Sequence, residues 1–497
     1  MPHLPSGLLI GRRAVVLSVT TALVGAVQLT TVPAQAVPDA KLTSKINSVM
    51  KDPGVQRARS GVVVLDSSGG LLYNRYGTRA VMAASNTKIL TAAAAMHTLG
   101  PGYRFKTEVI SRHKIVNGTL QGPLYLKGYG DPTSRQSDYA WLAKQVRAAG
   151  ITRVKDRLYV DASYYDAQRY NPGWSTAYAD DYYAAEISAL TVAPNADLDS
   201  GTVIVNYRPG SVGKKAKITT TPAAAASYVK IDNTTVTSAR GTSTSFSARR
   251  SYGSSTIRVS GRVPSGRAPG QWLITVAKPE LYAGAVFRAE LAKAGVTVAE
   301  GTSAGVTPTT SRRRVGLDTS MKLSSLLVPF MKLSNNMHAE ALTKAMGAKK
   351  GRPGSWKDGL GYTTAYLRSL GVPMAGVTLT DGSGLTRRNT MTPLALATVL
   401  HKVRREPWFA QFQTSLPVAG RRERMVGGTL RKRMNETVAA GNARAKTGTL
   451  SGVTALSGYV NGADGRLYVF SMLSNYSGST PRPVEDALVV TLAGWRR

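Results

Sequence analysis

Cysteine is absent from the 497-residue chain, and histidine occurs only five times. Without cysteine the protein has no disulfides, no thiol chemistry and no cysteine-based metal site, so packing alone must hold the fold. A Ser-His-Asp triad could draw only on His97, His113, His338 and His401 beyond the N-terminal region. No residue spacing typical of a metal site occurs either, and we therefore expect no metal ion and no other cofactor.

Acidic residues are scarce as well. The 28 Asp and Glu residues face 64 Lys and Arg residues, which gives a net charge of +36. Inside a cell this surplus would indicate nucleic-acid binding. Outside a bacterium the abundant polyanions are cell-wall polymers and carboxylate-rich peptidoglycan, on which a basic protein concentrates by electrostatic attraction. Solubility alone explains the charge equally well, so both interpretations stay open.

Long apolar segments are missing beyond the N-terminal region, and no later segment is long enough to span a membrane. At the N-terminus Arg12 and Arg13 precede the apolar run Ala14 to Val27, and the residues up to Ala36 fit the small-x-small pattern of a cleavage site. We predict a signal peptide over residues 1–36, which argues against a nucleic-acid partner. The mature chain would be secreted or cell-wall associated; an uncleaved N-terminal anchor is the alternative. Loss of Arg12 and Arg13 lowers the net charge to +34.

The chain after residue 36 is too long for one ordinary domain, and we expect two or three. Its two ends have the texture of a large α/β core. The elements expected there are a β-hairpin over Ser60 to Leu72, a buried helix over Ser85 to Leu99, a helix over Met337 to Met346, antiparallel strands over Thr454 to Val460 and Leu467 to Leu473, and a helix over Pro483 to Trp495.

The middle of the chain differs in composition. Over about residues 200–277, short strand-like segments alternate with Ser, Thr, Gly and Pro clusters, which predicts a small β-rich domain. Helical periodicity returns over Pro279 to Ala294. The Thr-, Ser- and Arg-rich stretch from Thr302 to Arg314 then indicates a linker.

Three short motifs follow one another along the chain. They are Ser85-Asn86-Thr87-Lys88, Ser334-Asn335-Asn336 and Lys446-Thr447-Gly448-Thr449. The S-x-x-K pattern alone is weak, because it also begins at Ser111, Ser211 and Ser227, in strand-like or loop-like surroundings. Only Ser85 opens a strongly apolar helix, which is the context that nucleophilic chemistry requires.

The helix gives the first motif its chemistry. A serine at a helix N-terminus lies at the positive end of the helix dipole, beside unpaired backbone N–H groups. Lys88 follows at i+3, projects from the same face and can reach the Ser85 hydroxyl. A lysine that is partly desolvated and crowded by other cations can be neutral near pH 7 and act as a base. Taken alone, however, such a pair is more often a capping serine and a surface lysine.

The other two motifs reverse that judgement. Lys446-Thr447-Gly448 occurs once in the chain, in a segment (Asn442 to Leu450) that predicts an edge strand leading into the strand at Thr454. Ser334-Asn335-Asn336 follows an apolar segment and precedes a helix, which places it on a connection. Three motifs in this order, each in suitable surroundings, indicate a single active site.

Together the motifs resemble the active-site triplet of penicillin-recognising serine enzymes. The chain is more specifically similar to the class C low-molecular-mass penicillin-binding proteins, the D-Ala-D-Ala carboxypeptidase/endopeptidase family. Further matching stretches are Gly128 to Pro132 (G-x-G-D-P), Tyr182 to Asn195, Asp381 to Leu385 (D-G-S-G-L) and Ser415 to Gly420 (S-L-P-V-A-G). The resemblance covers essentially the whole chain after the signal peptide. Asn335 stands where many relatives have Asp, which the S-x-N pattern tolerates.

The resemblance implies an α/β (α+β) fold. A penicillin-binding/β-lactamase-like transpeptidase core, an antiparallel sheet flanked by helices, would comprise residues 37–105 and 311–497. Residues 106–310 would form large inserted β-rich domains, because the first two motifs must meet although residues 89–333 separate them. The Ser60 hairpin and the two strands of the last third should then share one sheet.

By this resemblance, Ser85 attacks the carbonyl between the two terminal D-alanines of a peptidoglycan stem peptide, and Lys88 accepts its proton. Ser334, oriented with Lys446, passes that proton to the departing amine, and the backbone N–H groups of Ser85 and Thr449 form the oxyanion hole. The substrate-binding residues implied are Asn336 for a backbone amide, Lys446, Thr447 and Thr449 with Gly448 between them for the terminal carboxylate, and Ser383, Gly384 and Leu385 of the D-G-S-G-L loop. The sequence does not identify a residue that could act as the base for deacylation.

The expected function is a serine-type D-Ala-D-Ala carboxypeptidase that β-lactams inhibit, with D,D-endopeptidase action on cross-links as a further activity. One rival is a β-lactamase, against which the long insertion argues. The other is an inactive wall-binding protein, against which the intact motifs argue. Gly301 to Gly305 also matches the G-x-S-x-G nucleophile elbow, but the helix that this motif needs does not follow. For His338, close behind the second motif, we expect a helix-capping or surface role.

Overall fold

The computed structural model describes residues 39–496. The predicted signal peptide over residues 1–36 and its cleavage site lie outside these residues. Among the helices of residues 39–496, none combines the length and the apolar character that crossing a membrane requires.

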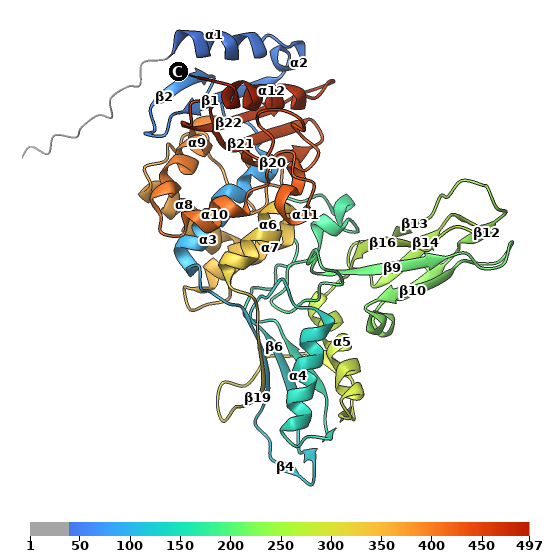
Figure 1. The fold of residues 1–497 in the computed structure, drawn as a ribbon. Coiled ribbons are helices and arrows are strands. Elements are labelled where there is room, and N and C mark those ends of the chain that lie inside the picture. Colours follow the sequence, from blue (N-terminus) through green and yellow to red (C-terminus); the bar gives the residue numbers. More distant parts are fainter. Residues whose placement is uncertain (1–38, 497) are drawn as a thin grey trace, which may run out of the picture. The chain divides into compact units, whose positions relative to one another are not determined.

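A five-stranded antiparallel sheet joins the two ends of the chain (Figure 1). Its strands, in spatial order, are β2 (Leu71–Arg75), β1 (Arg59–Leu65), β22 (Leu467–Asn475), β21 (Val453–Asn461) and β20 (Arg444–Leu450). The predicted hairpin near Ser60, the two strands of the last third and their common sheet are thereby confirmed. β20 is an edge strand, as its sequence predicted.

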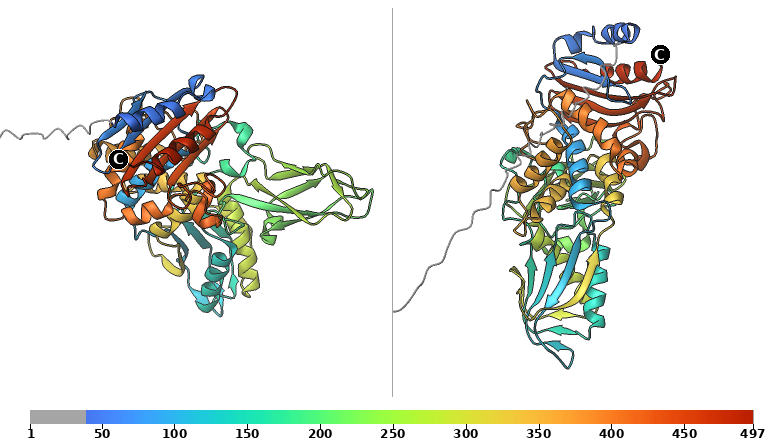
Figure 2. Two further views of the ribbon diagram at one scale, coloured as in Figure 1. Left: turned by 45° about the horizontal axis from the view of Figure 1, so that its top comes forward. Right: turned by 90° about the vertical axis from the view of Figure 1, so that its left-hand side faces the viewer.

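The sheet is buried on both faces. Side chains alternate along β1, so that Val62 and Val64 pack into one apolar cluster whereas Val63 and Leu65 pack into the other. The helices concerned are α1 (Ala40–Val49) and α12 (Arg482–Ala493) on the first face, and α3 (Thr87–Leu99) and α9 (Pro393–Lys402) on the second. In Figure 2 the red helix α12 crosses the strands of this sheet.

Helix α3 is the buried centre of the second layer. Ala92 to Ala95 are fully buried, and their small side chains let neighbouring helices approach from several sides. The neighbours are α6 (Leu323–Lys332), α7 (Asn336–Ala348) and α8 (Trp356–Ser369), with α10 (Phe409–Ser415) packed on α6. The predicted helices near Ser85 and Met337 are confirmed, and α3 ends before Gly100 as its sequence indicates.

The chain leaves this core after Phe105 and returns at Ser320. The backbones of these two residues lie side by side, since the Ser320 N–H donates to the Phe105 carbonyl (3.1 Å). Between them lies a five-stranded sheet with the order β18 (Thr302–Ala304), β8 (Leu158–Asp161), β6 (Leu124–Gly128), β3 (Lys106–Ser111) and β19 (Arg313–Thr319). In Figure 2 β3, coloured blue to teal, and β19, coloured yellow, run beside each other.

This sheet corrects the prediction of a linker over Thr302 to Arg314. Residues 302–304 pair with β8, and the strand that starts at Arg313 pairs with β3, so only the residues between them are irregular. Thr and Arg side chains on an edge strand gave the stretch its loop-like composition. Because β3 and β19 belong to one sheet, we propose that the insertion ends near Ser320 rather than at residue 310.

Two helices and a smaller sheet complete this part of the insertion. They are α4 (Gln136–Ala148), α5 (Pro279–Lys293), and a sheet of β17 (Thr297–Val298), β7 (Arg153–Val154), β5 (Thr119–Leu120) and β4 (Ile115–Val116). Both helices pack on each other and on the five-stranded sheet. The predicted helix from Pro279 is thus confirmed.

Short strands fill residues 202–275, which we call the β region. They are β9 (Thr202–Arg208), β10 (Lys217–Thr221), β11 (Lys230–Asn233), β12 (Val236–Ser238), β13 (Ser247–Arg249), β14 (Thr256–Ser260), β15 (Arg262–Pro264) and β16 (Gly270–Thr275). They form three small sheets around buried residues such as Val203, Phe246 and Ile257. The short strands expected over residues 200–277 are confirmed.

Candidate active site

Ser85 lies in a single 3-10 turn, Ala84–Asn86, that leads directly into α3. Ala84 has φ 45°, a left-handed conformation that is uncommon for alanine and that the Thr87 hydroxyl supports by donating to the Ala84 carbonyl (2.9 Å). Within the first motif Ser85 alone is partly exposed, whereas Asn86, Thr87 and Lys88 are buried. The turn therefore presents the Ser85 hydroxyl at the edge of a buried polar cluster, which consists of Lys88 and its hydrogen-bond partners.

Lys88 is the centre of that cluster. Its Nζ donates to Ser85 Oγ (2.8 Å), to Asn336 Oδ1 (2.6 Å) and to the Ser383 carbonyl (2.9 Å). The side chain is fully buried, and this burial lowers the pKa of Lys88 to about 7, although the charges of Asp381 and Glu340 act in the opposite direction. A lysine in this state can give and take a proton near neutral pH.

The second motif occupies the tight connection between α6 and α7. Ser334 has φ 60°, and Asn335 caps α7 by accepting from the N–H groups of Met337 and His338. Asn336, the first residue of the helix, bridges two walls of the site: its Oδ1 accepts from Lys88, and its Nδ2 donates to the Tyr183 carbonyl (2.8 Å). The cap and this bridge fix the direction in which Ser334 and Asn336 project.

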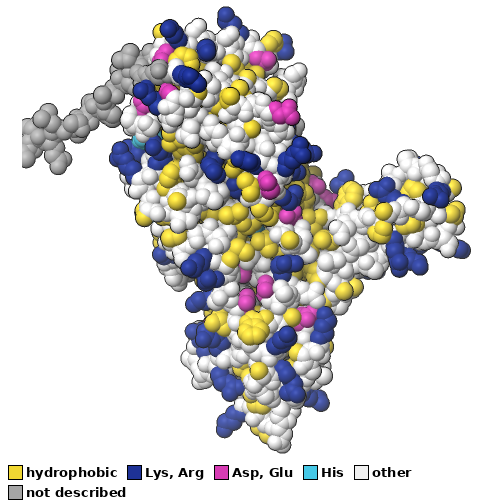
Figure 3. Space-filling model, in the orientation of Figure 1, with side chains coloured by type: hydrophobic (Ala, Val, Ile, Leu, Met, Phe, Trp, Pro, Cys, Tyr) yellow, Lys and Arg dark blue, Asp and Glu magenta, His cyan; other side chains and the backbone are white. Residues whose placement is uncertain are grey.

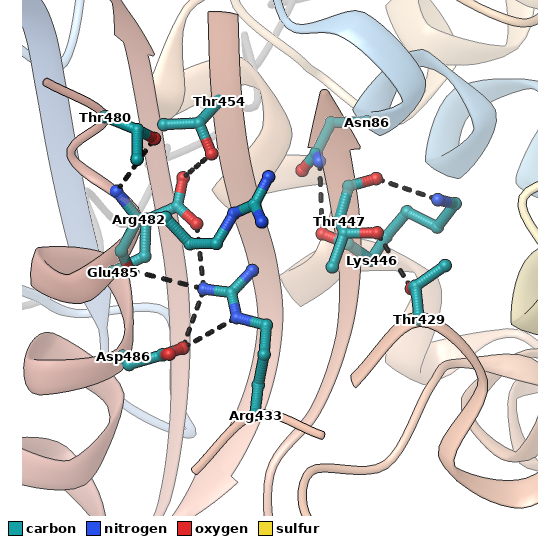
Figure 4. A network of polar contacts seen from close by, with 10 residues as sticks. All are labelled: Asn86, Thr429, Arg433, Lys446, Thr447, Thr454, Thr480, Arg482, Glu485 and Asp486. Atoms are coloured by element: carbon teal, nitrogen blue, oxygen red, sulfur yellow. Dashed lines mark hydrogen bonds and ion pairs between the residues drawn. The ribbon is translucent and has the colours of Figure 1, made fainter. Parts of the chain in front are cut away.

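Lys446 of β20 joins the second motif to the third. Its Nζ donates to Ser334 Oγ and to the Thr447 carbonyl, both at 2.8 Å, and the Asn86 side chain donates to the Lys446 carbonyl (3.1 Å; Figure 4). The structure thus brings all three motifs together, as their order predicted. Burial and then the charge of Lys88 hold the pKa of Lys446 well below its ordinary value.

The rest of the third motif divides between packing and exposure. Thr447 Oγ1 donates to Thr429 Oγ1 (2.8 Å), whereas Thr449 is exposed. A Cβ on Gly448 would lie 2.5 Å from the Ala83 carbonyl oxygen, so glycine is needed where β20 approaches the turn of Ser85. β20 is the edge strand of its sheet; near its start the Ala445 N–H donates to the Pro417 carbonyl (2.9 Å), and further along Gly448 lies against the turn of Ser85.

The D-G-S-G-L residues lie behind Lys88. Ser383 is fully buried and Leu385 is 6% exposed; the Ser383 hydroxyl accepts from the Leu385 N–H (3.2 Å). Gly384 has φ 79°, and a Cβ there would lie 1.9 Å from the Ala84 carbonyl oxygen. Burial and this close packing favour a supporting role over the substrate contact that the sequence suggested for these three residues.

Two functional candidates escaped the sequence analysis, Glu340 and Asp381. Both are fully buried, and their carboxylates accept hydrogen bonds from the backbone N–H groups of residues 382–384. Asp381 stands in a motif that was recognised without a role for its side chain. Glu340 could have been found by its position, because it follows Asn336 at i+4 on the same helical face.

The competing motifs have structural roles. Ser111 ends β3, and its hydroxyl donates to the Pro123 carbonyl (3.1 Å). Ser303 lies in β18, and an irregular segment follows it instead of the helix of a nucleophile elbow. His338 is fully buried beside the Leu198 carbonyl (3.0 Å), and burial lowers its pKa to about 4, so the expected capping or surface role is wrong.

Comparison with known proteins agrees with this geometry. The model of the D-Ala-D-Ala carboxypeptidase 3 (S13) family matches residues 42–494. A D-alanyl-D-alanine carboxypeptidase of Actinomadura sp. (strain R39) is 40% identical over 457 residues, which cover 91% of this chain and 84% of that protein. Carboxypeptidase DacB of Mycolicibacterium smegmatis is 30% identical over 86% of this chain and 79% of its own length.

A solved structure shows the same fold. Penicillin binding protein 4 (dacB) of Haemophilus influenzae superposes with a TM-score of 0.76 at 23% identity, over 90% of this chain and 98% of that one. The expected transpeptidase-like α/β fold is therefore confirmed. Since the family model spans nearly all of the described residues and a named carboxypeptidase shares 40% of them, the chain belongs to the D-Ala-D-Ala carboxypeptidase 3 (S13) family, a family of serine D,D-peptidases.

Proposed function

We propose that the protein removes the terminal D-Ala from peptidoglycan stem peptides through an acyl-enzyme on Ser85. The observation that carries this assignment is the environment of Lys88. Its Nζ contacts the Ser85 hydroxyl, and its side chain is fully buried. Because its pKa is about 7, a substantial share of the protein molecules carry Lys88 as a neutral amine near pH 7.

The hydrogen-bond partners of Lys88 Nζ fix the direction of its lone pair. A neutral lysine amine has two hydrogens and one lone pair. The Asn336 Oδ1 and the Ser383 carbonyl can only accept, so they take the two hydrogens. The lone pair is left for the hydroxyl hydrogen of Ser85. When Ser85 Oγ bonds to the scissile carbonyl carbon, its proton passes to Lys88 Nζ.

Breakdown of the tetrahedral intermediate requires a proton for the departing D-Ala amine. We assign its delivery to Ser334, which relays to the amine the proton that Lys88 took up, so that Lys88 is neutral again and Ser334 keeps its hydroxyl hydrogen. The Ser334 hydroxyl is held 2.8 Å from Lys446 Nζ. The negative oxygen of the intermediate would face the backbone N–H groups of Ser85 and Thr449, and one such donor contributes roughly 3 kcal/mol. Water then cleaves the ester, and the hydroxyl of Ser85 is restored.

The terminal carboxylate of the substrate would lie beside β20. Thr449 is exposed there, and Lys446 and Thr447 stand within the same strand. An incoming carboxylate favours the charged form of Lys446, which opposes the effect of burial on its pKa. Charge-assisted hydrogen bonds of this kind are about twice as strong as neutral ones.

Product analysis tests this function against its rivals. Purified enzyme is incubated with a stem pentapeptide, a cross-linked muropeptide and a β-lactam, and the products are identified by mass spectrometry. We expect release of D-Ala from the pentapeptide, cleavage of the cross-link by the same site, and loss of both in Ser85→Ala. Faster turnover of the β-lactam than of peptide would make the protein a β-lactamase. No turnover of any substrate would favour an inactive wall-binding protein.

We further propose that the enzyme acts outside the cell and binds anionic cell-wall polymers through the β region. Residues 201–277 contain eleven Lys and Arg residues but a single acidic residue, Asp232. Of these cations only Arg250 is buried, and Figure 3 shows dark blue side chains on this region. Within residues 39–496, ion pairs join just two of the eleven, Arg249 to Asp180 (3.4 Å) and Arg258 to Asp232 (4.0 Å).

Exposed and unpaired cations attract a polyanion in a salt-dependent way. The test compares binding to isolated cell walls before and after removal of their phosphate polymers. The variant Lys214→Glu/Lys215→Glu/Arg262→Glu should lose most of its binding. A control with the same change in charge, Lys41→Glu/Lys51→Glu/Arg57→Glu at exposed positions near the N-terminal helices α1 and α2, should keep its binding. Equal loss in both variants would mean that net charge alone, and no particular region, governs binding. Unchanged binding in both would contradict the proposal.

A further inference from the structure

Two carboxylates lie behind Lys88, and none of the steps above uses them. Glu340 projects from α7, one turn after Asn336, and Asp381 begins the turn of residues 381–386 that follows α8. Both side chains are fully buried. Burying one carboxylate is costly unless hydrogen bonds replace its hydration, and burying two together costs more because their charges repel.

Every partner of these carboxylates is a donor. Glu340 accepts from Trp356 Nε1 (2.7 Å), Gly382 N (2.9 Å) and Ser383 N (2.8 Å). Asp381 accepts from Trp174 Nε1 (2.9 Å), Gly384 N (2.7 Å), Thr386 N (2.8 Å) and Asn389 Nδ2 (2.8 Å). These groups cannot accept a carboxyl proton, so the contacts favour the ionised forms.

Burial acts against these contacts. Burial raises the pKa of Asp381, and burial followed by the charge of Asp381 raises the pKa of Glu340. Seven donors thus lower the pKa of two carboxyl groups that burial alone would neutralise. Such an arrangement is expected where the charge has a use.

The turn that the carboxylates hold is the one that contacts Lys88. Glu340 fixes the N–H of Ser383, and the carbonyl of the same residue accepts from Lys88 Nζ (2.9 Å). Helix α3 holds the turn from the other side, since Thr91 Oγ1 donates to the Gly382 carbonyl (2.6 Å). A movement of the turn would therefore displace the acceptor that orients the base.

We propose that Glu340 and Asp381 are positioning residues for acylation, which hold the Ser383 carbonyl against Lys88 and place buried negative charge behind its ammonium form. This inference rests on the proposed role of Ser85 and Lys88. It adds that the acidic limit of the reaction is set by two residues that touch neither substrate nor nucleophile.

The charges that face Lys88 come from three directions. Glu340 on α7 and Asp381 on the turn stabilise its ammonium form, whereas Lys446 on β20 is the cation that faces it. Beyond Glu340 lies Lys344, which is paired with Asp166 (2.6 Å). Removing the charge of Glu340 consequently makes Lys88 easier to deprotonate. Lys88 then remains a neutral base at lower pH than in the wild type.

The test is the pH dependence of acylation by a fluorescent penicillin. In Glu340→Gln and in Asp381→Asn we expect the acidic limb of the second-order rate constant to move to lower pH by roughly one unit. The plateau should fall at least tenfold, because an amide nitrogen then faces a backbone N–H and disturbs the turn. Glu340→Asp keeps the negative charge, but its shorter side chain draws the carboxylate away from the turn. The plateau of its rate constant should therefore fall, while its acidic limb stays at the wild-type pH.

Glu485→Gln is the matched control. Glu485 is also fully buried, burial raises its pKa to about 7, and it is bonded to Thr454 and Arg433, away from Lys446 (Figure 4). Its limb should not move. An unmoved limb in both charge-removing variants would overturn the role of Glu340 and Asp381 alone. Wild-type protein that is not acylated at any pH would overturn this role together with the proposed function.

Discussion

The buried cluster around Lys88 and the β region use cations in opposite ways. Lys88 is buried, and each of its three hydrogen bonds has a defined acceptor, so its reactivity depends on desolvation and on two carboxylates nearby. The cations of the β region other than Arg250 are exposed, and most of them lack an ion pair within residues 39–496. The buried charges around Lys88 change its reactivity, whereas the exposed charges of the β region attract partners and are screened by salt.

The largest expected effect separates the true S-x-x-K motif from its copies. In Lys88→Ala, kcat/KM for a stem pentapeptide should fall by about four orders of magnitude or more, because the Ser85 hydroxyl loses its base. Lys114→Ala, which changes the exposed lysine of the copy that begins at Ser111, should stay within twofold of wild type. Steady-state kinetics measure both. A loss below tenfold in Lys88→Ala would mean that another group takes the proton.

The next effect concerns the terminal carboxylate. A peptide whose terminal D-Ala is amidated keeps its scissile bond but loses the charge that Lys446 would meet. We expect kcat/KM to fall by about two orders of magnitude, equivalent to roughly 3 kcal/mol. The double variant Thr447→Val/Thr449→Val should lose most of this discrimination. Thr449→Val should account for the larger share, since the Thr447 hydroxyl already donates to Thr429. Equal hydrolysis of both peptides by wild type would contradict this role of β20.

A smaller effect tests the comparison from the side of the β region. Raising the salt concentration from about 0.05 to 0.3 M should reduce D-Ala release from intact cell walls roughly tenfold, because exposed cations are screened. Hydrolysis of a small soluble pentapeptide should change less than twofold, because the side chain of Lys88 is buried. An equal salt dependence of the two reactions would contradict this, because it would mean that exposed cations affect the hydrolysis itself and not only the binding of cell walls.

The smallest effect concerns Asn335. Asn335→Asp retains the oxygen that caps α7 but loses the Nδ2 that donates to the Leu198 carbonyl (3.2 Å), and it brings a second carboxylate toward Asp199. We expect a loss of about 1–2 kcal/mol in the free energy of unfolding, measured by thermal denaturation, with Ser85 acylation reduced less than tenfold. An unchanged melting temperature would indicate that the Leu198 contact contributes nothing.

Much of the core could be predicted from sequence because its signals are local. The hairpin at Ser60, the helix at Ser85 and the strands of the last third follow from apolar periodicity and turn residues, and each is confirmed. The segment near Thr302 failed because an edge strand on a small sheet is short and polar. Its pairing with β8 depends on residues far away in the chain, which no local pattern reports.

The residues of the site also fall into those that the sequence predicts and those that it does not. Motif residues such as Lys88 and Lys446 were named from sequence because their order and surroundings are specific. Glu340 was missed because a glutamate within a helix is usually exposed; its burial follows from the turn of residues 381–386, which folds against α7. The burial of His338 arises likewise from a distant loop, that of Leu198.

Identification of the acylated residue tests the central claim most directly. The protein is incubated with a penicillin, digested with a protease, and the modified peptide is sequenced by mass spectrometry. The account predicts one stable ester, on Ser85, which disappears in Ser85→Ala and forms far more slowly in Lys88→Ala. An ester on Ser111, Ser211, Ser227 or Ser303, or undiminished labelling of Ser85→Ala, would contradict it.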